Sequence, residues 1–481
     1  MIDSLSPTRT GSDMAGGLGF GCYRVSQSDP VHDEAMRQAL AHGVDMVDTS
    51  SNYSNGKSEM LVGTVLASIP EAKRPTVVTK LGYIQGDMLD LAKARASMGD
   101  ELADVVKLSD SAWHCIHPDF LEEALSTSFE RIGITPIDVV LLHNPEYYLQ
   151  IAHQSGTSLD EARTEFYRRI ELAFAWLESA VTEGRIRSYG ISSNTFANAT
   201  DAPDAVSLEL CFACAERVGS SGHHFTTAQM PMNVVEHGAA TTTNQAGGTS
   251  TTLERAVQLG VKVIVNRPLN AIVDSDLIRL VSHPMPSHIV HPDDVEQRIH
   301  ALETIEHDLV NSIMAGGSLS ERETQVAQEA FRIAGALCSA WTKFQGLPHW
   351  RDVRATYLDP RLEAAAMFAD RAPDPAAVHS YLHDVEHVLI DIDVVYAAEE
   401  NASLEELRQI LADEFGMPID TPLQHIAVQS LRCTPGVDHV LVGMRRPEYV
   451  EDILSVFELP EPTYHRATWQ RVAEHLARLS Q

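Results

Sequence analysis

The sequence predicts a (β/α)8 TIM barrel with an inserted helical subdomain. Eight short apolar runs alternate with helical patterns along the 481-residue chain, and this alternation is typical of βαβ units and a parallel sheet. The eighth run comes only after a long segment that carries helical patterns of its own. The chain also exceeds the roughly 250–300 residues at which single cores stop growing, so a second domain or large insertions are expected.

Each predicted strand is an apolar run bounded by polar or turn residues, and each is followed by a helical pattern. The strands are expected at residues 17–23 (GLGFGCY), 44–48 (VDMVD), 76–80 (TVVTK), 137–143 (IDVVLLH), 188–192 (SYGIS), 225–230 (FTTAQM), 261–266 (VKVIVN) and 439–443 (HVLVG). The helices are expected at 31–41, 57–67, 118–132, 158–181, 204–218, 252–258, 423–432 and 447–456. Eight strands, each followed by a helix, is the count of such a barrel.

Two connections are too long to be ordinary loops, and such connections usually carry function or structure of their own. One, at 81–117, follows the third strand, and the other follows the seventh. In the second, Ser318 with Glu321 and Ser403 with Glu406 form capping-box patterns that predict two helix starts. The predicted domains are barrel strands one to seven at 1–270, a helical insertion at 271–421, and the last barrel helix, strand and helix with a C-terminal tail at 422–481.

The composition narrows the class of protein. With 36 Lys and Arg against 67 Asp and Glu, the net charge is −31, which disfavours binding to nucleic acid or to anionic membranes. Only seven of the basic residues are Lys, which fits either a surface adapted to high salt or an acidic cytosolic protein. The six scattered cysteines predict free thiols, and the sequence has no signal-peptide or membrane-span pattern. We therefore expect a cytoplasmic protein.

Four complementary side chains are predicted to meet at the C-terminal rim of the barrel, where such barrels place their active sites. Asp48, Lys80 and His143 end strands two, three and four, and Tyr53 lies just after strand two. A Lys ammonium beside a Tyr hydroxyl favours the phenolate and lowers the Tyr pKa from about 10. The carboxylate keeps the Lys charged. A neutral His can form a hydrogen bond with the substrate oxygen that the Tyr hydroxyl protonates. The set predicts a proton donor to a carbonyl oxygen whose carbon receives hydride.

The segments that carry these residues, DTSSNYSNGKSEMLVG, VVTKLG and FLEEALSTSFERIGITPIDVVLLHNPE, are followed by GRIRSYGISSN, QMPMN and VDHVLVGMRRPEYVEDIL. In this order they resemble the aldo-keto reductase superfamily, and most of the long insertion lies outside the resemblance. The resemblance implies that Tyr53 is the general acid in reduction and the general base in oxidation. It implies that Lys80 modulates the Tyr53 pKa, that Asp48 is the partner of Lys80, and that His143 orients the substrate.

The resemblance also implies a nicotinamide cofactor that lies across the rim without a Rossmann glycine fingerprint. Ser192, with Ser193 or Asn194, and Gln229 would hold the carboxamide. Asn266 stands where the family often has a stacking aromatic residue, and Arg267 beside it is available for a phosphate. The expected cofactor contacts are Ser192, Ser193, Asn194, Gln229, Asn266, Arg267, Leu269, Gly443, Arg445 and Arg446.

Arg445, with Arg446, resembles the clamp for the adenosine 2′-phosphate, next to the N-terminus of the last barrel helix. The alternative is a solvated surface pair of arginines. Tyr449, Asp452 and Ile453 depart from the residues that members often carry downstream. The resemblance at Arg445 and Arg446 favours NADP, and NAD is possible.

Tyr23, Tyr83 and Trp113 are expected to line the substrate pocket if residues 81–117 fold over the rim. The alternative for Trp113 is that it only anchors this loop. Two metal-like clusters are interpreted as core cysteines and as a polar loop, so no metal site is expected. They are Cys211 and Cys214 with His223 and His224, and His283 with His288 and His291.

These observations together predict an NADP(H)-dependent oxidoreductase that interconverts a carbonyl and an alcohol on a small polar substrate, such as an aldehyde, a ketone or a sugar. One alternative is an NAD-linked sugar dehydrogenase. Another is a slow cofactor-binding sensor whose helical insertion binds a partner, and the intact set of Asp48, Tyr53, Lys80 and His143 argues against it. The composition favours neither direction of the reaction and no oligomeric state.

Overall fold

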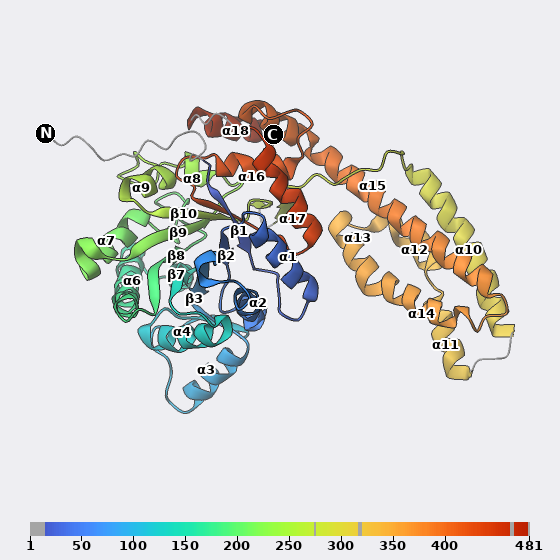
Figure 1. Cartoon of the computed structure of the whole chain (residues 1–481), viewed down its shortest axis with the longest axis horizontal. Helices are drawn as coiled ribbons and strands as arrows, with labels where there is room; N and C mark the ends of the chain where they lie inside the picture. The colour runs from blue at the N-terminus through green and yellow to red at the C-terminus, as the bar shows by residue number, and fades with distance from the viewer. Residues whose placement is uncertain (1–14, 274–275, 316–319, 462–465, 480–481) are drawn as a thin grey trace. The chain divides into compact units, whose positions relative to one another are not determined.

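The computed structural model describes residues 15–273, 276–315, 320–461 and 466–479 (Figure 1). The chain divides into two compact units, one formed by Met1–Val281 with Arg408–Gln481 and the other by Ser282–Leu407. The insertion expected at 271–421 is therefore shorter at both ends. At its start, β11 (Asn270–Val273) and β12 (Asp276–Arg279) form an antiparallel hairpin that belongs to the first unit. At its end, the boundary falls inside a long helix, α15 (Pro375–Phe415).

A closed barrel of eight parallel strands forms the centre of the first unit. Its strands are β1 (Gly17–Gly21), β2 (Met46–Asp48), β3 (Thr76–Leu81), β7 (Ile137–His143), β8 (Ile186–Ser192), β9 (Phe225–Pro231), β10 (Lys262–Asn266) and β13 (His439–Val442). Each strand pairs with the next, and β13 closes the ring by pairing with both β10 and β1. The predicted (β/α)8 barrel is confirmed, with all eight strands.

Helices surround the barrel in alternation with the strands (Figure 1). They are α1 (Pro30–Ala41), α2 (Lys57–Leu66), α4 (Pro118–Ile132), α6 (Leu159–Thr182), α7 (Leu208–Gly219), α9 (Thr252–Leu259), α16 (Leu423–Arg432) and α17 (Pro447–Leu454). Side-chain caps set several of the starts. Ser207 accepts from the N–H of Leu210, so α7 begins at Leu208 rather than at residue 204 as predicted. Thr251 and Glu254 form a reciprocal capping box at α9.

The interior of the barrel determines where the polar strand ends point. A buried apolar cluster is formed by Met46, Val78, Val139, Leu141, Ile264 and Leu441. Because side chains alternate between the two faces of a strand, the residue two positions further on points to the same face. Those residues on β2, β3 and β7 are Asp48, Lys80 and His143. The alternation therefore aims all three into the barrel at its C-terminal rim.

The long connection after β3 builds a small sheet of its own. Its antiparallel strands are β4 (Tyr83–Ile84), β6 (Ala112–His114) and β5 (Val106–Ser109), in that order. A helix, α3 (Asp87–Ser97), lies between β4 and β5 in the chain. The register places His114 opposite Tyr83 and Trp113 opposite Ile84. This register decides which aromatic side chain of β6 faces the barrel rim.

The second unit is helical. It contains α10 (Pro292–Ala315), α11 (Glu321–Ala330), α12 (Ala334–Ala340), α13 (Leu347–Val353), α14 (Asp359–Ala369) and the first part of α15. These helices enclose a core of their own, in which Trp341 and Trp350 are buried. Throughout the described residues, no helix combines the length and apolar character that crossing a bilayer needs.

Two predicted helix starts in this unit are wrong. The capping box of α11 is formed by Ser320 and Glu323, two residues later than predicted, and Ser318 lies outside the described residues. Ser403 lies inside α15, where its hydroxyl bonds the carbonyl of Glu400. The same Ser-x-x-Glu pattern therefore starts a helix in one place and continues one in another.

A buried carboxylate, Glu306 of α10, ties three helices of this unit together. It accepts hydrogen bonds from the backbone N–H groups of Ile333, Ala334 and Gly335, at 2.9, 2.7 and 3.2 Å. It also accepts one from the hydroxyl of Tyr381 on α15. A carboxylate at a helix N-terminus satisfies N–H groups that have no partner within the helix. Glu306 thereby fixes α12 against α10.

Candidate active site

The structure brings together the four residues predicted for the rim. Lys80 is fully buried, and its Nζ donates to Asp48 Oδ1 and, at 2.9 Å, to the carbonyl of Thr49. Its third contact is the hydroxyl oxygen of Tyr53, at 3.4 Å. Tyr53 enters from a short 3-10 turn, Tyr53–Gly56, directly after β2. One ammonium thus contacts both the carboxylate and the phenol.

Burial and the neighbouring charges determine the protonation states of Lys80 and Tyr53. Burial disfavours the Lys80 ammonium, but Asp48 and Tyr53 outweigh it and raise the Lys80 pKa, so the amine stays protonated. For Tyr53, burial raises the pKa above its ordinary value, and Lys80 offsets this only in part. The sequence prediction of a lowered Tyr53 pKa is therefore wrong for this structure. The phenol is held in its protonated form, ready to donate.

His143 is a neutral hydrogen-bonding group. Burial, with the nearby charge of Lys80, holds its pKa well below the usual value near 6.5. Its Nδ1 lies 3.0 Å from the hydroxyl oxygen of Ser50. Its ring meets the Tyr53 ring edge-on, with centroids 5.9 Å apart. A neutral imidazole beside the Tyr53 phenol can bond a substrate oxygen without competing for positive charge.

A chain of hydrogen bonds joins this group to the next strands of the barrel. Gln229 Nε2 donates to Asp48 Oδ2 at 2.7 Å. Gln229 Oε1 in turn accepts from Ser192 Oγ at 2.9 Å and from Asn266 Nδ2 at 3.2 Å. Asn266 Oδ1 is buried without a hydrogen-bond partner among the described residues. A buried acceptor of this kind fits a ligand that carries an N–H donor, such as a carboxamide.

The other expected carboxamide contacts lie beside this chain, in the turn after β8. Ser193 is buried, and its Oγ lies 3.2 Å from Thr195 Oγ1. Asn194 is exposed, and its backbone N–H donates to Glu146 Oε1 at 2.9 Å. The side chain of Asn194 is therefore presented to solvent on a turn that Glu146 holds.

The residues expected to contact phosphates differ in their availability. Arg445 is half-buried and Arg446 is exposed, and neither guanidinium bonds to another residue in the described part of the chain. Arg267 Nη2 forms an ion pair with Glu236 at 3.0 Å, and Arg267 Nε is buried without a partner among the described residues. The contact of Arg267 with a phosphate stays a prediction. Leu269 is partly buried, and its carbonyl accepts from Leu280 N–H. At Gly443, an added Cβ would meet no described atom within 4 Å, which leaves open space beside the rim.

Two tyrosines stand next to Tyr53 and His143, as expected for pocket walls. Tyr23 is 66% exposed, and its ring meets the Tyr53 ring edge-on at 5.2 Å. Tyr83 packs against the His143 ring at 4.8 Å. Its hydroxyl lies 2.6 Å from that of Tyr147 and accepts from Asn144 Nδ2 at 2.9 Å. The aromatic side chains form one wall beside the Tyr53 hydroxyl.

Trp113 lies elsewhere. The next residue on the same strand, His114, packs against Tyr83 and bonds the carbonyl of His143 at 2.7 Å. Successive side chains of a strand point to opposite faces, so Trp113 points away from His143. The Lys107 ammonium lies over its ring at 4.8 Å. Trp113 therefore anchors the small sheet, and the buried His114 packs against Tyr83.

Sequence reasoning did not identify His114, Asn144, Tyr147 or Glu146 as residues of this region. Three of them follow His143 directly in the segment HNPEYY, so their spacing from a strand end was an available signal. Asn144 adopts a φ of +51°, a left-handed conformation that Asn tolerates better than most residues. The turn points the chain into α5 (Tyr147–Gln154).

The ionisation of Glu146 is expected to make the free energy of unfolding depend on pH. It is 1% exposed, and burial raises the pKa of its carboxyl to about 7. Between the ordinary value of 4.5 and about 7, the folded chain holds a proton that the unfolded chain loses, so the free energy of unfolding falls as the pH rises. The variant Glu146→Gln keeps an acceptor for the Asn194 N–H and loses this titration. We expect it to gain about 3 kcal/mol relative to wild type between pH 4.5 and pH 8.

Urea denaturation of both proteins at several pH values measures this difference. The exposed cap residue Glu161 supplies a matched control, Glu161→Gln, whose difference from wild type should not follow the same curve. An equal difference between Glu146→Gln and wild type at pH 4.5 and pH 8 would contradict the assigned titration.

The fold and the site define a class: a (β/α)8 barrel protein with a buried Lys–Asp pair, a Tyr and a neutral His at its C-terminal rim. Comparison with known proteins agrees. The model described as "Aldo/keto reductase family" matches residues 16–271. Because this match covers more than half of the chain, the chain belongs to the aldo/keto reductase family.

Curated relatives match part of the chain. The aldo-keto reductase yakc [NADP(+)] of Schizosaccharomyces pombe is 27% identical over 192 residues, which cover 39% of this chain and 45% of that protein. An NADH-specific methylglyoxal reductase of Escherichia coli is 25% identical over 159 residues, 31% of this chain and 44% of that protein. The chain thus matches less than half the length of these relatives.

Solved structures resemble the chain over nearly its whole length at low identity. An aldo-keto reductase of Bacillus halodurans in its holo form is 15% identical, with a TM-score of 0.45, and the match covers 95% of this chain and 92% of that one. A glycerol dehydrogenase of Gluconobacter oxydans is 16% identical, with a TM-score of 0.47 and coverage of 96% and 91%.

Proposed function

We propose that the protein is an NADP(H)-dependent oxidoreductase that interconverts a carbonyl and an alcohol on a small polar substrate. The observation that carries the proposal is the placement of Lys80 Nζ, which contacts Asp48 and lies 3.4 Å from the Tyr53 hydroxyl at the barrel rim. Tyr53 can therefore act as a general acid or base beside the permanently charged Lys80 ammonium. Membership of the aldo/keto reductase family supports the same reaction class.

In reduction, the Tyr53 hydroxyl donates its proton to the carbonyl oxygen, and in oxidation the Tyr53 phenolate accepts the proton of the alcohol. Lys80 stabilises the negative charge that Tyr53 carries after donation. Asp48 keeps Lys80 charged and oriented, and neutral His143 bonds the substrate oxygen. A bound nicotinamide supplies or accepts the hydride at the carbon.

We place the cofactor along the rim from Ser192 to Arg445. The orphaned Asn266 Oδ1, next to Gln229 and Ser192, supports a carboxamide position. Arg445 and Arg446 lie free of described partners at the start of α17, which supports a position for a 2′-phosphate. The two curated relatives differ in cofactor, one being named for NADP(+) and the other for NADH. An NAD-linked dehydrogenase is therefore the second candidate.

Replacing Arg445 by Ala tests the cofactor assignment. A charge-assisted bond to a phosphate is worth about 1.5–3 kcal/mol, so we expect NADPH affinity to fall by roughly 10–100-fold. NADH affinity should stay the same, because NADH lacks the 2′-phosphate. Fluorescence titration of the full chain with each nucleotide gives both values.

The control is Arg332→Ala, which removes a surface arginine of the helical unit, 74% exposed at its side chain. Equal binding of NADPH and NADH by the wild type would favour the NAD-linked candidate. Binding of NADPH without turnover on any carbonyl or sugar substrate would favour a sensor.

We also propose that the reaction acts on a small molecule in the cytoplasm. The substrate is a small molecule, in keeping with the family and with the rings of Tyr23 and Tyr83 beside Tyr53 and His143. The six cysteines are free thiols in the structure, which supports the reducing environment of the cytoplasm.

A further inference from the structure

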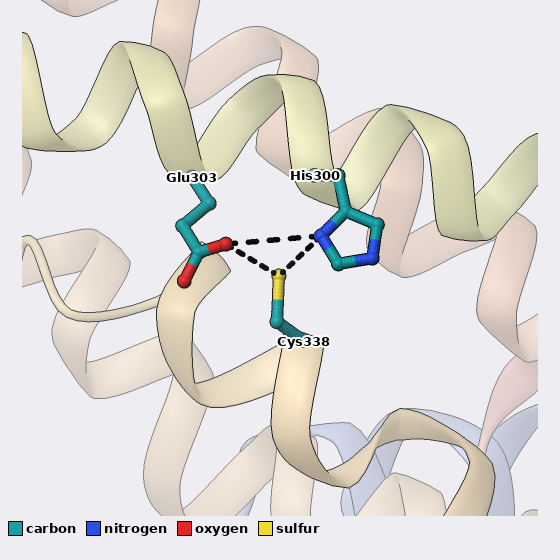
Figure 2. Close-up of side chains that lie close together, drawn as sticks. All are labelled: His300, Glu303 and Cys338. Carbon is teal, nitrogen blue, oxygen red and sulfur yellow. Dashed lines mark hydrogen bonds and ion pairs between the residues drawn. The ribbon is translucent and has the colours of Figure 1, made fainter.

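Three side chains of the helical unit converge outside the barrel altogether. His300 and Glu303 stand one turn apart on α10, and Cys338 approaches them from α12 (Figure 2). Their ligand atoms all lie within 4.8 Å of one another, and within the described residues this is the one group of three that could hold a metal ion. The group combines an imidazole, a carboxylate and a thiol, and each of these is a ligand type that zinc accepts.

The distances within this group are close to those between the ligands of a tetrahedral ion. Cys338 Sγ lies 3.2 Å from Glu303 Oε2 and 3.5 Å from His300 Nδ1. His300 Nδ1 lies 3.7 Å from Glu303 Oε2. Ligands bound tetrahedrally at the usual zinc distances stand about 3.3–3.6 Å from one another. The three separations of 3.2, 3.5 and 3.7 Å lie close to these values, so small side-chain rotations would bring the three atoms to three corners of a zinc site.

Rigid elements hold the three side chains in this arrangement. His300 and Glu303 share a helix face because residues three apart are neighbours on a helix. The register of α12 is fixed by Glu306, one turn after Glu303, through its bonds to the N–H groups of Ile333, Ala334 and Gly335. Cys338 lies one turn after Gly335. The contacts that position Cys338 are therefore buried and independent of any ion.

We propose that His300, Glu303 and Cys338 bind one zinc ion through Nδ1, a carboxylate oxygen and the thiolate. When the ion binds, the Sγ–H proton leaves to solvent and a bond from sulfur to zinc takes its place. The side chains of His300 and Glu303 are 60% and 49% exposed, so the fourth position opens to solvent and takes water. The ion links α10 to α12 and is separate from the reaction proposed for the barrel.

Cobalt titration of the metal-stripped full chain tests the site. Co²⁺ takes the place of Zn²⁺ in tetrahedral sites and reports a thiolate ligand by charge-transfer absorption. We expect one equivalent of Co²⁺ to produce this absorption and Zn²⁺ to abolish it. Cys338→Ser should remove the absorption, and His300→Ala should weaken binding by about tenfold or more, since even outer contacts of a metal site are worth 10–100-fold.

Two controls use the same residue types outside the group. They are His307→Ala on the same helix, at a side chain 77% exposed, and Cys433→Ser in the barrel unit. Both should bind Co²⁺ as the wild type does. Alkylation of wild-type thiols, read by peptide mass, adds a measurement without a variant: Zn²⁺ should protect Cys338. No thiolate absorption at one equivalent of Co²⁺, its persistence in Cys338→Ser, or unprotected Cys338 would overturn the proposal.

Discussion

Turnover of the Tyr53→Phe variant is expected to fall by about 10²–10⁴-fold, the range over which a positioned proton donor contributes to catalysis. The substitution removes one hydroxyl and keeps the ring that packs edge-on against Tyr23 and His143. Lys80 keeps its bonds to Asp48 and to the Thr49 carbonyl. The barrel rim therefore stays folded, and NADPH affinity should not change.

Steady-state kinetics in both directions and NADPH titration measure these effects together. Tyr23→Phe is the matched control, because it removes a hydroxyl from the neighbouring ring, and it should retain turnover near that of wild type. If Tyr53→Phe kept turnover within a few-fold of wild type, the proton would have to come from another group.

Replacing Lys80 by Met is expected to cost both stability and turnover. The variant leaves the Asp48 carboxylate buried, with Gln229 as its remaining side-chain donor. Removing one partner of a buried pair costs about 3–5 kcal/mol. Without Lys80, the folded state raises the pKa of Asp48 further, so the loss of stability should grow as the pH rises above the unfolded value of 3.8.

The double variant Lys80→Met with Asp48→Asn separates the two contributions. Asn removes the unpaired charge, so the double variant should regain much of the stability while turnover stays low. Chemical denaturation of the double variant and of the two single variants, Lys80→Met and Asp48→Asn, at pH 5 and pH 8 gives the coupling between the two sites. Additive losses of stability would show that Asp48 and Lys80 do not act as a pair.

The barrel could be predicted from the sequence because its determinants are local. Each strand is a short apolar run, and every second side chain points into the barrel. Asp48 therefore points to the same face as Met46, and Lys80 to the same face as Val78. The polar ends of neighbouring parallel strands then have to meet at one rim. The same rule places His143 beside them without any information from the rest of the chain.

The sequence predictions fail where contacts between distant parts of the chain determine the orientation, the partner or the pKa of a side chain. A one-residue difference of register exchanges the two faces of a strand, so only the observed pairing of β6 with β4 shows that His114 faces the rim and that Trp113 does not. The ion pair of Arg267 with Glu236 could not be predicted, because the two residues lie 31 positions apart in the chain. The Tyr53 pKa depends on the depth of burial as well as on the Lys80 charge, and a sequence contains only the second.

The zinc ligands were missed for a related reason. His300 and Glu303 form a visible pair at a spacing of three, but Cys338 lies 35 residues after Glu303. The thiol is brought to them by the contact of Glu306 with α12. A ligand set divided between two packed helices has no fixed sequence spacing to recognise.

The position of β13 in the barrel has a consequence for synthesis of the chain. It pairs with β10 and β1, yet residues 267–438 separate it from β10. At about 5–20 residues per second, a ribosome needs roughly 10–35 s to cross that stretch. During this time the nascent sheet has seven strands and two unpaired edges, which are the surfaces that lead to aggregation. The barrel can therefore close only after His439–Val442 has emerged.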